Sequence, residues 1–176
     1  MSEPPDRVAL TADLQRARTD FAHLLEVVSE PDWKQPTAST RWTNEQLLFH
    51  MVFGYMIVRR LLFLARVFGC LPDAVSRGFA HILDVAARPF HVINYYGTCA
   101  AALVYNRNRM GKKMDRVIAK LQRALAREND SSLLRGMHYP QSWDPYFRRY
   151  MTLADVYRYA GQHYDHHRRQ LTLAKL

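Results

Sequence analysis

Apolar residues recur every three or four positions along most of this chain, the spacing that places side chains on one face of an α-helix. The spacing begins within residues 10–28 and returns in three later stretches, near 43–68, 104–125 and 153–176. The alternation of apolar and polar residues that marks a half-buried strand is hard to find. Four long amphipathic helices in one short chain predict an all-α fold, a four-helix bundle.

Two of the predicted helices begin at a capping box. In this motif a Ser or Thr hydroxyl accepts a hydrogen bond from the backbone N–H three residues later, and the carboxylate or amide of that later residue accepts one from the backbone N–H of the Ser or Thr. Thr43 and Gln46 form one such pair, and Thr152 and Asp155 form the other. The second helix is therefore expected to start near Thr43 and the fourth at Leu153, from which it continues to the C-terminus.

Two segments do not fit the helical pattern. Residues 71–97 contain Pro72, Pro89 and Gly97, so we expect a long crossover between the second and third helices, with one short helix at 74–86. About twenty residues then join the third helix to the fourth. Connectors of that length are uncommon in compact domains unless they are functional or disordered, which makes this one a candidate functional segment.

Length and composition indicate one domain spanning residues 1–176. A chain of 176 residues with 48% hydrophobic content can bury one core but is short for two domains. The start has no secretory pattern, and the apolar run 47–58 is shorter than a membrane span. Cys70 and Cys99 are expected to be free thiols, as is usual in a cytoplasmic protein.

The formal net charge of +9 raises nucleic acid as a partner. The basic residues form separate clusters at 59–60, 107–116, 148–149 and 168–169, with no recognition-helix, zinc-finger or RNP motif beside them. We therefore expect solvated basic helix faces and no specific nucleic-acid partner.

Three histidines in "HYDHH" lie near the C-terminus, and helical geometry separates them. His167 lies about 40° round the helix from His163 and about 6 Å further along, on the side of the apolar stripe. Val156, Ala160, Leu171 and Ala174 mark that stripe. His166 lies about 60° to the other side, so it is expected to flank the site or face solvent.

His50 lies in the middle of the most apolar face of the second helix. A lone histidine there would more often be a hydrogen-bonded core residue than a ligand. Together with a core-facing pair on another helix, it would supply the three neutral imidazoles of a catalytic zinc site. Gly54, one turn beyond, leaves room either for a substrate or for tight helix packing.

The core-facing stripe of the third helix reaches two polar residues at its start, Arg107 and Asn108. They could line a substrate cavity, where Arg107 would bind a carboxylate, or they could reach water at a frayed helix end. The sequence leaves both interpretations open.

Two motifs resemble those of the DinB-like, or YfiT-like, proteins. "RWTNEQLLFHMV" is similar to the signature that opens their second helix, and "LADVYRYAGQHYDHHRRQL" is similar to their last helix. The resemblance covers nearly the whole chain. It implies a four-helix bundle with a long crossover, often dimeric, that holds a divalent metal through residues matching His50, His163 and His167.

The resemblance also implies a range of activities. Characterised relatives include S-transferases that use mycothiol, bacillithiol or glutathione, and a mycothiol-dependent maleylpyruvate isomerase. A thiol or a water bound to the metal would each be activated, giving transfer to a small electrophile or hydrolysis. Zinc is the expected metal, with nickel or iron as alternatives. A metal- or ligand-binding protein without turnover and a basic nucleic-acid-binding bundle are the other hypotheses.

Overall fold

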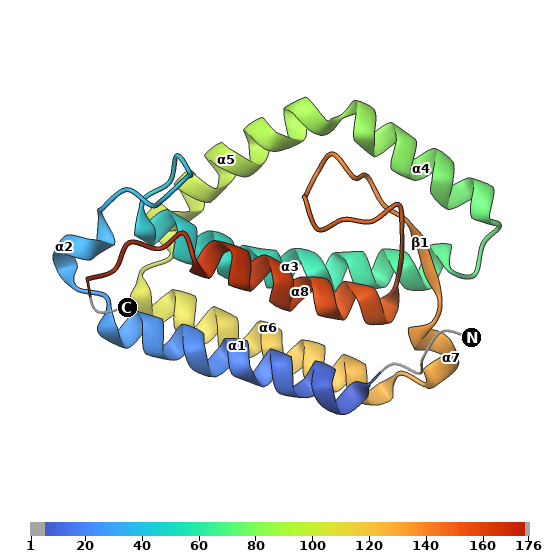
Figure 1. Ribbon diagram of the computed structural model, residues 1–176, viewed down its shortest axis with the longest axis horizontal. Coiled ribbons are helices and arrows are strands. Elements are labelled where there is room, and N and C mark those ends of the chain that lie inside the picture. Colours follow the sequence, from blue (N-terminus) through green and yellow to red (C-terminus); the bar gives the residue numbers. More distant parts are fainter. Residues whose placement is uncertain (1–5, 175–176) are drawn as a thin grey trace.

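Four long helices form the body of the protein in the computed structural model, which describes residues 6–174. They are α1 (Arg7–Val27), α3 (Asn44–Phe68), α6 (Arg107–Arg127) and α8 (Leu153–Arg168). Figure 1 shows α8 and α1 side by side, with α3 and α6 behind them. The buried apolar residues of all four helices form one core. The predicted four-helix bundle is confirmed.

Contacts at the helix ends fix the direction of each helix. Arg7 at the start of α1 donates to the carbonyl of Leu125 near the end of α6, so these two helices are antiparallel. Arg66 near the end of α3 pairs with Glu128 just beyond α6, so α3 and α6 are parallel. Parallel neighbours need a connection as long as the bundle, which explains why the chain has a long crossover.

Two helices build this crossover, α4 (Asp73–Val85) and α5 (Ala87–Val104). Figure 1 shows them as an arch over α3 and α8. The short helix expected at 74–86 is α4, but the expectation that the rest is broken is wrong. Pro89 lies in the first turn of α5, where no backbone hydrogen bond is lost. Gly97 is helical as well, because one glycine weakens a helix without ending it.

The third long helix begins later than its apolar stripe suggested. Val104 is the last residue of α5, and α6 starts at Arg107. Asn106 caps α6 by accepting a hydrogen bond from the backbone N–H of Arg109. The chain therefore turns between two helices at 105–106, a boundary that apolar spacing alone did not reveal.

The connector between α6 and α8 is more ordered than its prolines suggest. It contains α7 (Asp130–Leu133) and a two-stranded antiparallel hairpin, β1 (Gly136–His138) and β2 (Tyr150–Thr152). Between these strands the chain forms a loop that lies under the α4–α5 arch (Figure 1). The remaining short helix, α2 (Glu30–Trp33), follows α1.

Both predicted capping boxes are present, at the starts of α3 and α8. The end of α8 differs from the expectation, because the helix stops at Arg168 instead of continuing to the C-terminus. Thr172 then hydrogen-bonds the side chain of Asn44 at the start of α3. Leu171 and Ala174 therefore do not belong to the helical stripe, and Ala174 is exposed.

Within residues 6–174, α3 is the helix long and apolar enough to cross a membrane by length and composition. Of its most apolar window, 56% is buried inside the fold. The elements that α3 contacts include α5, α6 and α8.

Candidate metal centre

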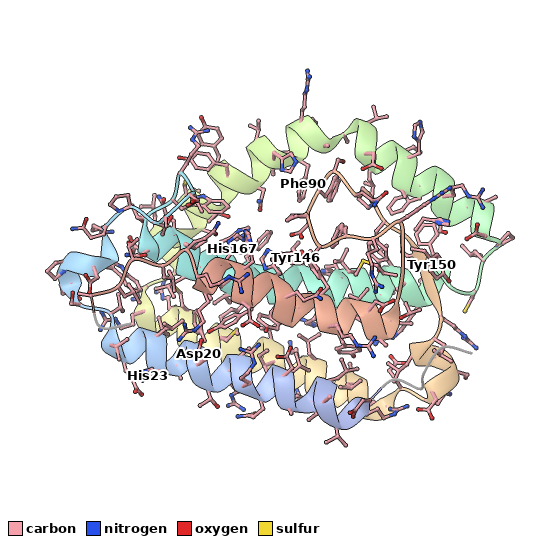
Figure 2. The ribbon with its side chains drawn as sticks, viewed as in Figure 1. Asp20, His23, Phe90, Tyr146, Tyr150 and His167 are labelled. Atoms are coloured by element: carbon pink, nitrogen blue, oxygen red, sulfur yellow. The ribbon has the colours of Figure 1, made fainter. Side chains whose placement is uncertain are left out.

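Three histidines meet between α3 and α8. One nitrogen from each of His50, His163 and His167 can be chosen so that all three lie within 4.8 Å of one another. His50 and His163 are only 5% and 7% exposed. Figure 2 shows His167 on the side of α8 that faces the crossover, whereas Asp20 of α1 lies on the opposite side of α8.

Burial keeps these rings neutral. Together with the neighbouring histidines, it lowers the pKa of His163 to about 4 and that of His167 to about 3. The same two causes place the pKa of His50 well below its usual value. Each imidazole therefore has a lone pair available near pH 7, the form in which histidine binds metals.

Hydrogen bonds fix how two of the rings are turned. Nδ1 of His167 donates a 2.7 Å hydrogen bond to the side-chain oxygen of Gln170, which leaves the lone pair of Nε2 free to bind a metal. The Thr98 hydroxyl lies 3.3 Å from Nδ1 of His50. Trp42 stacks on His50, with 4.4 Å between ring centres. These contacts leave the rings little freedom to turn.

Gly54 makes room for the third ring. A Cβ atom at this position would lie 2.7 Å from both Cε1 and Nδ1 of His163, closer than such atoms approach in proteins. Of the two explanations that the sequence left open for Gly54, the contact shows tight packing, and the packed group is a histidine of the cluster. Gly54 also borders the cavity described below.

The donor set fits a divalent metal. Tetrahedral zinc with bonds of about 2.05 Å places its nitrogen ligands roughly 3.3 Å apart. Rings whose nitrogens already lie within 4.8 Å need to shift by about an ångström at most. Three neutral imidazoles suit zinc, nickel and iron, and they leave at least one coordination position for a further ligand.

His166 lies at the edge of this cluster. Its Nδ1 is 3.2 Å from the Tyr146 hydroxyl, and its Nε2 is 3.4 Å from the side-chain nitrogen of Gln170. The three-nitrogen cluster does not include it. His166 points to a different side of α8 than His163 and His167, and its ring contacts Tyr146 and Gln170.

A cavity of about 230 Å³ opens beside the histidines, between α3, α5, α8 and the connector loop. Aromatic and aliphatic side chains make up most of its wall, among them Phe53, Phe90 and Trp143. No lysine or arginine of the described residues lines it. The cavity therefore suits a small molecule without a negative charge.

The connector loop contributes a carboxylate that the sequence analysis did not identify. Asp144 accepts hydrogen bonds of 2.9 Å from the Tyr159 hydroxyl and from the backbone N–H of Tyr146. One of its oxygens is 3.8 Å from Nε2 of His163. Burial raises the pKa of this carboxyl. In the sequence, Asp144 is set apart as the one acidic residue between residues 131 and 151, which does not by itself mark a site.

Arg107 and Asn108 lie away from the cavity. Arg107 donates a 2.7 Å hydrogen bond to the carbonyl of Val28 at the end of α1 and lies over the ring of Trp33. Asn108 is exposed to solvent. The substrate-lining interpretation of these two residues does not match their positions, and Arg107 instead ties the start of α6 to the end of α1.

The two cysteines also lie outside the cluster. Both are free thiols, as expected, with Cys70 exposed and Cys99 half-buried. Neither is grouped with the three histidines.

Comparisons with known proteins give a family and a fold. The model of the DinB superfamily matches residues 13–171. No curated protein matches the sequence. One similar solved structure is YfiT from Bacillus subtilis, described as a probable metal-dependent hydrolase with an unusual four-helix bundle topology. The two chains share 11% sequence identity with a TM-score of 0.64, and the similarity covers 97% of this chain and 86% of YfiT.

Proposed function

The chain belongs to the DinB superfamily, and on that premise we propose that it is a divalent-metal-dependent hydrolase acting on a small, uncharged electrophile. The observation that carries this proposal is the convergence of three neutral imidazoles, two of them buried and one half-buried, and one carboxylate on an apolar cavity. His50, His163 and His167 would hold the metal. A bound divalent cation would supply an acidified water or thiol.

Asp144 is the residue proposed to accept the proton of the attacking water. Its carboxylate borders the cavity next to His163, and burial raises its pKa toward the range in which a general base operates. The hydroxyl of Tyr159 and the backbone N–H of Tyr146 hold the carboxylate in place. The aromatic wall would exclude bulk water and position the electrophile.

A thiol transferase is the second candidate, and the apolar wall favours it. A thiol needs no general base, because it reacts as the thiolate, which an adjacent metal stabilises. In that case Asp144 would be dispensable and a low-molecular-weight thiol would be a cosubstrate. A protein that binds metal without turnover is the remaining alternative.

Metal analysis of purified variants tests the site. We expect about one metal per chain in the wild type and its loss in His50→Ala, His163→Ala or His167→Ala, because two imidazoles do not complete the coordination. His166→Ala is the matched control and should bind metal with a loss of at most about 10- to 100-fold in affinity. Metal retained in His167→Ala but lost in His166→Ala would refute the assignment.

Activity assays on the metal-loaded protein then separate the chemical alternatives. Hydrolysis of a neutral aryl ester without thiol supports the hydrolase. Conjugation of an aryl halide only when a thiol is added supports the transferase. Stoichiometric metal with neither reaction, across a panel of esters, amides and epoxides, would contradict both enzymatic proposals.

A further inference from the structure

The outer side of the α3–α6 pair is a basic groove. Six cationic side chains line a depression of about 420 Å³ between these helices. They are Arg59, Arg60 and Arg66 from α3, and Lys120, Arg123 and Arg127 from α6. The groove shares no residue with the cavity at the candidate metal centre.

The basic row continues along α6 beyond the groove. Arg109, Lys113 and Arg116 precede Lys120 at alternating spacings of four and three residues. Together with Arg123 and Arg127, they lie within about 40° of one line along the helix, over about 27 Å. The parallel packing of α3 and α6 thus places Arg59 and Arg60 in one groove with Lys120, Arg123 and Arg127, which are far from them in the sequence.

Carboxylates do not balance this charge. The one acidic residue of α3, Glu45, pairs with Lys34, and the one acidic residue of α6, Asp115, pairs with Arg18 of α1. Arg66 pairs with Glu128. In the described part of the chain, no ion pair involves the other five cations of the groove. Like charges three or four residues apart on a helix repel each other, so a bound polyanion would relieve this strain.

The groove is shaped for one strand. Packed helices have axes 8–10 Å apart, so the depression between them is too narrow for a duplex, whose major groove alone is about 12 Å wide. Phe63 lies among the cations and is 61% exposed, which offers a ring on which a base can stack. We propose that the α3–α6 groove binds single-stranded nucleic acid through its phosphates, without sequence preference.

Fluorescence anisotropy with a labelled 20-nucleotide strand of mixed sequence tests this proposal. Affinity should fall with salt, with a slope of log K against log salt near −0.7 per phosphate contacted, or about −4 for six contacts. The triple variant Arg59→Gln, Arg123→Gln and Arg127→Gln should bind at least tenfold more weakly and reduce the slope by about 2. These side chains are exposed, so thermal unfolding should show an intact fold.

The matched control removes the same charge elsewhere. Arg88, Arg149 and Arg169 are exposed and lie outside the groove, so their replacement by Gln should change affinity less than threefold. Phe63→Leu should weaken binding about tenfold without changing the salt slope. Equal losses in both triple variants, tighter binding of duplex than of single strand, or binding only to phosphatidylserine vesicles would each overturn the proposal.

Discussion

Replacing Gly54 by alanine tests whether the fold reserves space for a metal-binding histidine. The new Cβ would lie 2.7 Å from the His163 ring, about 0.7 Å inside the 3.4 Å at which ordinary contacts begin. The contacted atoms are at the end of a side chain that can rotate, so the bundle can accommodate the change. His163 would move by at least the 0.7 Å overlap, and a coordination site tolerates a displacement of only about 0.5 Å.

The effects on stability and on metal binding should therefore separate. Alanine stabilises a helix by about 1 kcal/mol relative to glycine, whereas overpacking costs about 1–3 kcal/mol. The metal-free Gly54→Ala protein should be destabilised by about 0–2 kcal/mol, a fall in Tm of at most about 4–8 °C. Its metal affinity should fall by about 10- to 100-fold, the loss that is typical when a residue that orients a metal ligand is removed.

Gly78→Ala is the matched control, because Gly78 is also helical and nothing lies within 4 Å of its added Cβ. Its Tm should rise by about 2–4 °C with unchanged metal affinity. Metal affinity is measured by competition with a chelating dye, and Tm by circular dichroism in chelator. Wild-type metal affinity in Gly54→Ala, or the same rise in Tm as in the control, would refute the reasoning.

Three further predictions concern the cavity, the histidines and Arg107. If water is the nucleophile, Asp144→Asn should retain metal but hydrolyse substrate about 10²- to 10⁴-fold more slowly, because an amide accepts no proton. The rate is measured at steady state, and an unchanged rate would leave thiol transfer as the better candidate. Burial lowers the pKa of His163 to about 4 and of His167 to about 3, so between pH 6.5 and 4 the unfolded chain binds more protons than the folded one. The unfolding free energy of the metal-free protein should therefore fall by about 2 kcal/mol per ring from pH 7 to pH 5. Urea titration at both pH values checks this, and equal stability at pH 7 and pH 5 would contradict it. Arg107→Ala removes a hydrogen bond to Val28 and a contact with Trp33, so urea titration should show a loss of about 1–2 kcal/mol while metal content and turnover stay at wild-type values.

The four bundle helices, and the starts of α3 and α8, could be predicted because the signals are local. A capping box is complete within four residues, so Thr43 and Thr152 mark helix starts without knowledge of the fold. The angles of His50, His163 and His167 follow from helix geometry in the same way. Leu171 and Ala174 lie beyond the end of α8, so their assignment to the helical stripe was wrong. The stripe was still correctly placed, because Val156 and Ala160 are buried.

The second helix of the crossover and the fold of the connector could not be predicted because their signals depend on position. Pro89 ends a helix in most contexts but is tolerated in the first turn of α5. Asp144 had no partner in the nearby sequence that would mark it as part of a site. Its neighbour His163 is close only because the connector loop folds back over α8. Such contacts follow from the tertiary structure and leave no periodic pattern.

These two segments also create the chemistry of the site. Without them, the histidine face of α3 and α8 would open directly to water. Phe90 of α5 stacks on Trp143 of the connector with 3.7 Å between ring centres, and Trp143 donates a hydrogen bond to the carbonyl of Leu83 in α4. Figure 2 shows Phe90 under the arch. Because burial is the largest cause of the lowered histidine pKa values, the segments that close the cavity also keep His163 and His167 neutral and able to bind metal.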